Sequence, residues 1–248
     1  MAVRDLADIA AIEAIPLSKR ALPESTYAVL VAGAERTPDT KALSFFLSAD
    51  RLDATHHWTY AELVADITRA ANAFAAFGVT TDRPVAFVLP NLPETHFTIW
   101  GGEAAGAALA INPMLEPRQI AELMRAARAS VLVTLAPALN PKGWSGLVAE
   151  LASLPDLRTI ASVDMADYPD SGTGEAARAS IAEAAASSPV KVVNLRHAMR
   201  EMPFDRLLTD RLTSAPAARP ARRRLRPGRI EAKCSTPGPS RRCSPAPS

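Results

Sequence analysis

Apolar side chains follow a helical spacing most clearly in the segment that begins at Tyr60 and ends at Phe77, where they recur every three or four positions. Thr59 and Glu62 stand at the spacing of an N-terminal capping box, which satisfies two otherwise unpaired backbone N–H donors at a helix start. Gly78 follows at the point where a left-handed residue is favoured. We therefore predict a helix that begins after Thr59 and ends before Gly78.

Upstream of this helix, the pattern predicts one further helix and a hairpin. One apolar face in residues 25–36 predicts a helix, and Pro38 marks its end. Residues 42–47 and 56–59 are short strand-like runs, and the polar segment 48–54 between them predicts a turn. Residues 1–24 precede this pattern, and we interpret them as an N-terminal extension.

Downstream of the helix, short apolar runs alternate with helical segments. The predicted strands are 84–89, 107–111, 130–135, 158–163 and 191–195, and the predicted helices are 92–105, a segment opened by Pro117, and 147–154. Near-continuous apolar strands that alternate with helices favour parallel crossovers and burial on both faces of the sheet. The predicted fold class is therefore α/β, an open doubly wound sheet with an N-terminal hairpin. We also expect a loop at 168–175, a small helix at 176–186 and a turn of helix at 204–208.

The composition changes abruptly at residue 215. Residues 215–248 contain nine Arg or Lys, one acid and seven prolines, a net charge of +8. Because the whole chain carries +2, residues 1–214 carry −6. A segment with so few large apolar residues cannot bury enough surface to offset its ordering entropy, so we expect it to be disordered. The predicted division is an extension at 1–24, an α/β domain at 25–214 and a basic tail at 215–248.

The cysteines and the apolar segments limit the location of the chain. Cys234 and Cys243 both lie in the basic tail, so the predicted domain contains no disulfide framework and no thiolate metal site. No run of 18 apolar residues occurs, and acids interrupt the N-terminal stretch where a signal-peptide core would lie. We therefore expect a cytoplasmic protein without a membrane span. The sequence does not indicate an oligomeric state.

The histidines and one Gly-rich segment are the candidate sites of this sequence. His56 and His57 lie in the predicted hairpin, His96 follows a predicted helix start, and His197 lies in a weakly patterned segment. None stands at a spacing typical of a metal site or a catalytic triad. The segment 171–174, Ser-Gly-Thr-Gly, lacks a following lysine and is interpreted as a loop rather than a phosphate cradle. We assign no catalytic, cofactor-binding or metal-ligating residue.

Residues 58–134 carry the strongest family signal. They contain "WTYAEL" and then "VAFVLPNLPETHFTIWGGEAAGAALAINPMLEPRQIAELMRAARASVLVT". This region resembles the N-terminal part of AMP-binding, adenylate-forming acyl-CoA synthetases. The matching positions are Thr59, Tyr60, Glu62, Leu63, Leu89, Pro90, Asn91, Ala105, Gly106, Ala107, Asn112, Pro113 and Leu115. A weaker match extends over residues 25–208.

The resemblance implies an ATP-dependent carboxylic acid–CoA ligase that uses ATP, Mg and coenzyme A, with an acyl-adenylate intermediate. It also implies a scaffold role for the matching positions. We expect Gly106 to let a helix end close to a strand, Asn91 to cap backbone donors, and Asn112 to have a structural role. The family's phosphate loop, of the form "TSGTTGxPK", its magnesium and ribose ligands and its C-terminal lysine are absent from the sequence. We therefore expect no cofactor to bind this chain and no reaction by this chain alone.

The basic tail leaves three hypotheses open. The segment 204–208 precedes an acidic pair and the phosphate loop in the family, whereas Arg222, Arg223 and Arg224 follow here. GACGAC encodes Asp-Asp and becomes Arg-Arg when read one base over, so a frameshift from 215–221 onward would explain the tail. Alternatively, the arginines bind nucleic acid or an anionic surface without sequence specificity, since no aromatic residue lies among them. A third hypothesis is a stand-alone α/β binding domain.

Overall fold

A computed structural model of the chain describes residues 3–20, 23–136, 141–164, 168, 179, 183–184, 186, 188 and 190–208. The predicted tail at 215–248 and the Gly-rich segment 171–174 lie outside these residues, as does most of the helix predicted at 176–186. The predictions for these segments remain predictions.

The N-terminal residues form short helices and the predicted hairpin. The elements are α1 (Leu6–Glu13), a 3-10 turn at Leu17–Lys19, α2 (Thr26–Arg36), β1 (Lys41–Phe45), a 3-10 segment at Ala49–Ala54 and β2 (His56–Thr59). Ser25 caps α2 by accepting a hydrogen bond from the Ala28 backbone N–H. β1 and β2 pair antiparallel, from Lys41 opposite Thr59 to Phe45 opposite His56. The helix at 25–36 and the hairpin are confirmed, whereas α1 was not predicted.

Helix α3 (Tyr60–Ala76) follows the hairpin directly and confirms the best-marked sequence prediction. The Thr59 hydroxyl accepts from the Glu62 backbone N–H, and the Glu62 carboxylate accepts from the Thr59 backbone N–H at 2.8 Å. Gly78 has a φ of 88°, a left-handed conformation that favours glycine and ends the helix. The side chains of Ile67 and Phe74 are fully buried.

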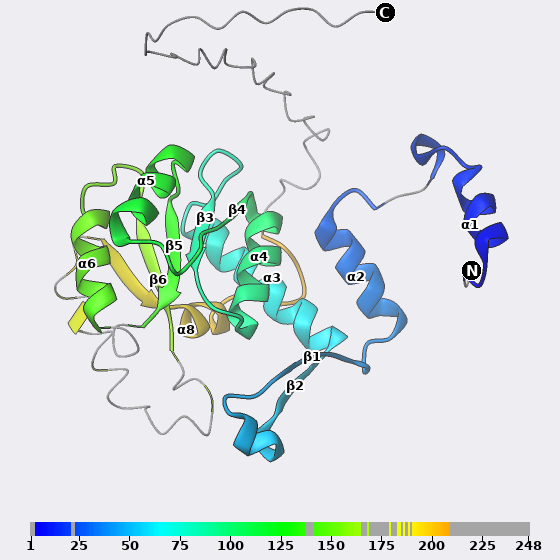
Figure 1. Cartoon of the computed structure of the whole chain (residues 1–248), viewed down its shortest axis with the longest axis horizontal. Helices are drawn as coiled ribbons and strands as arrows, with labels where there is room; N and C mark the ends of the chain where they lie inside the picture. Colours follow the sequence, from blue (N-terminus) through cyan, green and yellow to red (C-terminus); the bar gives the residue numbers. More distant parts are fainter. Residues whose placement is uncertain are drawn as a thin grey trace, which may run out of the picture. The chain divides into compact units, whose positions relative to one another are not determined.

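Within the described residues, a parallel sheet of five strands forms the centre of the fold, in the order β4-β3-β5-β6-β7 (Figure 1). Its elements are β3 (Val85–Val88), α4 (Pro93–Ala105), β4 (Ala108–Ala110), α5 (Pro117–Ala127), β5 (Val131–Leu135), α6 (Pro141–Leu151), β6 (Thr159–Val163), β7 (Lys191–Asn194) and α8 (Leu195–Arg200). The predicted α/β fold class is confirmed.

Helices cover both faces of this sheet, as the near-continuous apolar strands predict. Helices α3, α4 and α8 pack on one face, against strand residues such as Phe87 and Val133. Helices α5 and α6 pack on the other face, against residues such as Leu132 and Ile160. The strands therefore divide their side chains between two cores.

The end of the described chain differs from the prediction. Residues 204–208 form bends rather than a turn of helix, and the helix lies earlier, at Leu195–Arg200. Asn194 starts α8 by accepting a hydrogen bond from the His197 backbone N–H at 2.8 Å. The predicted strand at 191–195 therefore ends one residue early, because its last position is already helical.

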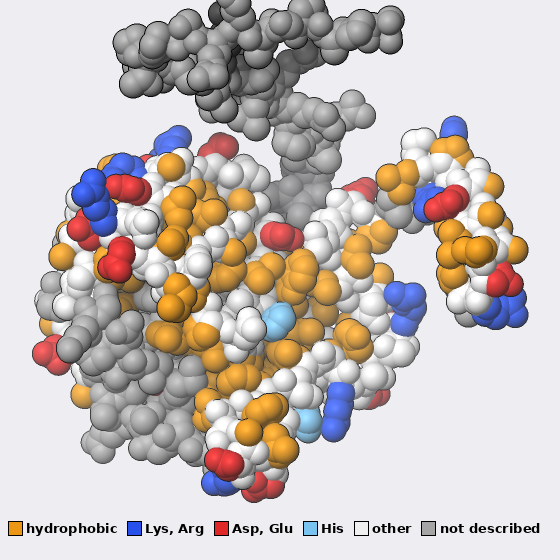
Figure 2. Space-filling model, in the orientation of Figure 1, with side chains coloured by type: hydrophobic (Ala, Val, Ile, Leu, Met, Phe, Trp, Pro, Cys, Tyr) orange, Lys and Arg blue, Asp and Glu red, His pale blue; other side chains and the backbone are white. Residues whose placement is uncertain are grey.

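The surface shows where apolar side chains remain uncovered. A group of them lies on the β1–β2 hairpin and its connecting segment (Figure 2), where Phe46, Leu47 and Leu52 are exposed. No helix among the described residues is long and apolar enough to span a membrane.

Candidate functional site

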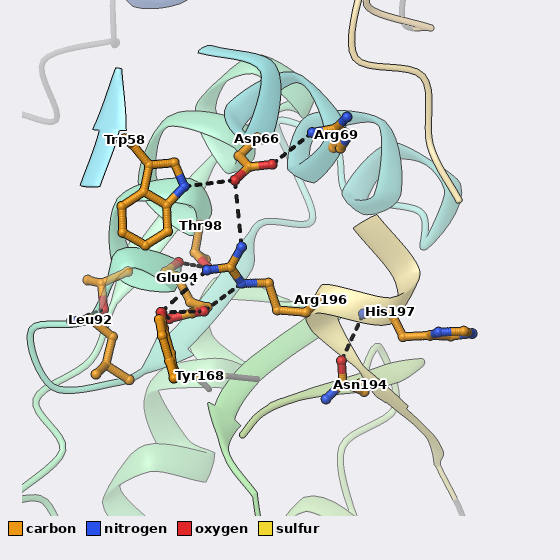
Figure 3. A network of polar contacts seen from close by, with 11 residues as sticks. Trp58, Asp66, Arg69, Leu92, Glu94, Thr98, Tyr168, Asn194, Arg196 and His197 are labelled. Carbon is orange, nitrogen blue, oxygen red and sulfur yellow. Dashed lines mark hydrogen bonds and ion pairs between the residues drawn. The ribbon is translucent and has the colours of Figure 1, made fainter. Parts of the chain in front are cut away.

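A buried ion pair joins helices α4 and α8 (Figure 3). Glu94 has no solvent-exposed surface, and its Oε1 accepts a hydrogen bond from Arg196 Nε at 2.7 Å. The Tyr168 hydroxyl lies 2.9 Å and 3.0 Å from the two carboxylate oxygens of Glu94 and donates to them. The carboxylate is thus neutralised by a guanidinium and hydrogen bonded by a phenol, as a buried charge requires.

The same guanidinium also reaches helix α3. Arg196 Nη1 lies 3.6 Å from Asp66 Oδ2, while Asp66 Oδ1 accepts from Arg69 Nη1 at 2.9 Å. The indole N–H of Trp58 donates to Asp66 Oδ2 at 3.1 Å. The network therefore holds two carboxylates and two guanidinium groups, and it connects the hairpin, α3, α4 and α8.

Three aromatic rings surround the guanidinium of Arg196. Its central carbon lies 5.1 Å from the ring centre of Phe97, 5.6 Å from that of Trp58 and 5.7 Å from that of Tyr168. Such contacts stabilise a cation that has lost part of its hydration. The ring shell keeps this arginine in place within the core.

The protonation states of this network indicate a structural role for its residues rather than a catalytic one. Burial alone would lower the pKa of Arg196, but the charge of Glu94, its hydrogen bond and the neighbouring Tyr168 together raise it above the ordinary value. Burial, followed by the charge of Glu94, raises the pKa of Tyr168 far above its ordinary value. The phenol therefore stays protonated near neutral pH and acts as a hydrogen-bond donor rather than a base.

A second buried polar contact attaches residues 203–208 to helix α3. The side-chain amide of Asn72 donates to the carbonyl oxygens of Pro203 and Arg206, both at 2.9 Å, and its oxygen accepts from the Leu208 backbone N–H at 2.7 Å. The guanidinium of Arg69 lies 4.7 Å from the ring centre of Phe204. These bonds to the backbone hold the segment in bends, which explains why the predicted turn of helix is wrong.

Asn91 does not have the role that the sequence predicted. It is exposed and makes no side-chain hydrogen bond to a described residue. Thr95 supplies the contacts at the start of α4 instead, since its hydroxyl donates to the Pro90 carbonyl at 2.6 Å and lies 3.3 Å from the Leu92 backbone N–H.

Asn112 and Gly106 have structural roles. The side-chain oxygen of Asn112 accepts from the Met114 backbone N–H at 2.9 Å, which forms a local turn after β4. Gly106 ends α4 where the backbone of Thr80 approaches closely. A Cβ at this position would lie 2.3 Å from the Thr80 carbonyl carbon, so only glycine fits here without a shift of the backbone. Both predictions of a structural role are confirmed.

The four histidines are all exposed. His57 pairs with Ser44 across the hairpin, with 2.8 Å between Nδ1 and the hydroxyl, and His56 contacts the ring of Trp58. His96 lies on α4 and His197 on α8. Among the described residues, no group of three or more His, Cys, Asp or Glu side chains is placed to hold a metal ion.

The pairing of Glu94 with Arg196 is not among the contacts that the sequence predicts. Glu94 lies in the first turn of α4, where an acid is favoured by the helix dipole, so its presence there needed no further explanation. The sequence does contain one signal that Glu94 is buried. Glu94 lies three and four residues before Phe97 and Thr98, and this helical spacing places its carboxylate on the buried side of the helix.

Comparison with known proteins identifies the family. The model of the AMP-binding enzyme family matches residues 30–206. The chain is similar to a marinolic acid–CoA ligase of Pseudoalteromonas sp. (strain SANK 73390), 33% identical over 139 residues that cover 56% of this chain and 21% of the ligase. It is also similar to the fatty acid–[acyl-carrier-protein] ligase MmaC of Mycobacterium marinum, 30% identical over 169 residues that cover 68% of this chain and 29% of MmaC.

Solved structures agree on the fold. An acyl-CoA synthetase of Brucella canis superposes with a TM-score of 0.54 at 18% identity, over 80% of this chain and 33% of that protein. The chain thus spans between about a fifth and a third of the length of these relatives. Since the family match spans residues 30–206, which is most of the chain, and includes the whole parallel sheet of the described residues, this chain belongs to the AMP-binding enzyme family.

Proposed function

We propose that this chain supplies the N-terminal α/β part of an ATP-dependent carboxylic acid–CoA ligase. The whole reaction joins a carboxylate to ATP, releases pyrophosphate to leave an acyl-adenylate, and then transfers the acyl group to coenzyme A. The observation that carries the proposal is the family match over residues 30–206, together with relatives named as acid ligases. ATP, Mg and coenzyme A are the partners of the whole enzyme, and we propose a cytoplasmic location for it.

We infer that these 248 residues do not catalyse the reaction by themselves. The sequence contains no Ser/Thr- and Gly-rich loop followed by lysine, the element that holds ATP phosphates through backbone N–H groups. The clustered carboxylates Glu94 and Asp66 face arginines, so they do not fit a magnesium site, and we assign no reaction step to them. The apolar side chains of the hairpin are exposed, which supports the proposal that a further part of the whole enzyme covers them.

The origin of the basic tail remains part of this proposal. We propose that residues 25–214 form an incomplete AMP-binding domain, and that a frameshift in the region 215–221 produced the residues that follow. Translating the gene in its two other frames tests this directly. A phosphate-loop sequence of the form "GTTGxPK" shortly downstream supports the frameshift, and its absence from both frames rejects it.

Pyrophosphate release tests the function. The purified full chain is incubated with ATP, Mg, coenzyme A and a mixture of carboxylic acids, beside the same chain without acid. We expect no acid-dependent pyrophosphate above background. Acid-dependent release would show that this chain is an active ligase and would refute the inferred inactivity.

The alternative function of the tail, binding to nucleic acid or anionic surfaces, finds no support in the comparisons. A salt-sensitive gel shift that is lost on deletion of residues 215–248 would revive it.

A further inference from the structure

A small pocket lies where the order of the parallel strands reverses. The chain passes from β3 to β4 on one side and then crosses to β5 on the other side of β3. In open α/β sheets, ligands bind in the crevice outside the carboxyl ends of the strands at such a reversal. Here, the ends of β3 and β5, the loop after β4 and helices α5 and α6 enclose about 130 Å³.

The described lining of this pocket is apolar apart from two side chains. Val88, Leu115 and Ile120 are among its walls, and none of the described lining residues is charged. Thr134 and Trp144 are the lining residues whose side chains carry a polar atom. An apolar crevice with a few converging polar groups is the usual form of a small-molecule site.

Thr134 is the observation that points to a ligand. This residue is only 6% exposed, and it lies opposite Val88 in the register of β3 and β5. Its hydroxyl makes no hydrogen bond to the side chain or backbone of any described residue. A buried hydroxyl without a partner is unfavourable, and valine would fill this strand position without that cost. A bound molecule would supply the missing partner.

We propose that this pocket binds a small uncharged molecule with one apolar ring and one oxygen that forms a hydrogen bond with Thr134. The size fits, since an apolar cavity of about 150 Å³ accommodates one benzene molecule. None of the described lining residues offers a positive charge to a carboxylate or phosphate, so these residues favour an uncharged molecule. The proposal does not depend on the ligase function, because it rests on the lining residues of this pocket alone.

Fluorine NMR of two probes tests the proposal on the full chain. 4-Fluorophenol and fluorobenzene share a ring, but only the first carries a hydroxyl. We expect 4-fluorophenol to bind about threefold to tenfold more tightly than fluorobenzene, the contribution of one hydrogen bond. Thr134→Val keeps the shape of the side chain and removes the hydroxyl, so it should abolish this preference.

Pocket filling gives an independent readout. Leu115→Phe places a larger side chain in the wall and should weaken both probes, whereas Leu123→Phe, on the exposed side of α5 and outside the pocket, should affect neither. Equal binding of both probes, an unchanged preference in Thr134→Val, or no effect of Leu115→Phe overturns the proposal. The melting temperature of Thr134→Val tests whether the hydroxyl forms a hydrogen bond within the protein. It should not fall below that of the wild type, and a fall would show that the hydroxyl already has a partner inside the protein.

Discussion

Replacing Arg196 with methionine should destabilise the chain strongly. Methionine retains much of the apolar stem, but it leaves the fully buried carboxylate of Glu94 without the guanidinium at 2.7 Å. Removing one partner of a buried ion pair costs about 3–5 kcal/mol. Because the Tyr168 hydroxyl continues to donate to both carboxylate oxygens, we expect the lower end of this range, about 3 kcal/mol.

The matched control is the same substitution in an exposed pair. Arg118 Nε lies 3.0 Å from Glu122 Oε1 on α5, but these side chains are 80% and 55% exposed. Exposed pairs of this type contribute about 0.3–0.5 kcal/mol, so Arg118→Met should have little effect. Urea unfolding of both variants, followed by far-UV circular dichroism, measures the two free energies of unfolding under the same conditions.

A double variant separates the loss of the pair from the loss of packing. Glu94→Leu combined with Arg196→Met removes both charges and should recover much of the stability lost in the single variant, since neither ion then remains unpaired. A loss below about 1 kcal/mol in Arg196→Met would contradict the expected burial cost. A double variant no more stable than the single one would show that packing, rather than charge, dominates.

Three further predictions concern helix capping, chain attachment and backbone approach. Hydrogen bonds from the backbone and hydroxyl of the N-cap residue lower the pKa of Glu62 below its ordinary 4.5. The wild type should therefore have a larger free energy of unfolding than Glu62→Gln at pH 7, and this difference should disappear as the pH falls below 4.5, measured by urea titration at each pH. Asn72→Ala removes three hydrogen bonds to residues 203–208 and should cost about 2 kcal/mol, with loss of hydrogen-exchange protection at the Leu208 amide. Gly106→Ala places a Cβ against backbone and should lower the melting temperature, whereas Gly33→Ala, with open space in α2, should raise stability by about 0.5–1 kcal/mol.

Local patterns predicted the elements whose ends are set by neighbouring residues. The start of α3 depends on Thr59 and Glu62, three residues apart, and its end on Gly78, so the sequence alone is sufficient there. The strands were predictable because burial on both faces makes β3 entirely apolar and leaves β5 and β6 mostly apolar. The parallel order then follows from the intervening helices.

The buried polar contacts could not be predicted in the same way. Arg196 meets Glu94 across 102 residues, and Asn72 meets Leu208 across 136, so no periodicity within a segment carries information about either pair. The turn of helix expected at 204–208 fails for this reason, since its bends depend on bonds to a distant side chain. The pocket at the strand reversal was equally hidden, because Thr134 looks like an ordinary strand residue until its neighbours are known.

The separation between Glu94 and Arg196 has a consequence for synthesis on the ribosome. Strands β3, β4 and β5 are complete long before α8 emerges, so a growing chain can assemble three of the five described strands while the carboxylate on α4 still lacks its guanidinium. Nascent intermediates of this kind are the usual targets of chaperones and proteases. We therefore expect ribosome-bound chains that end before residue 196 to be cleaved readily by added protease, and chains that extend through α8 to resist it.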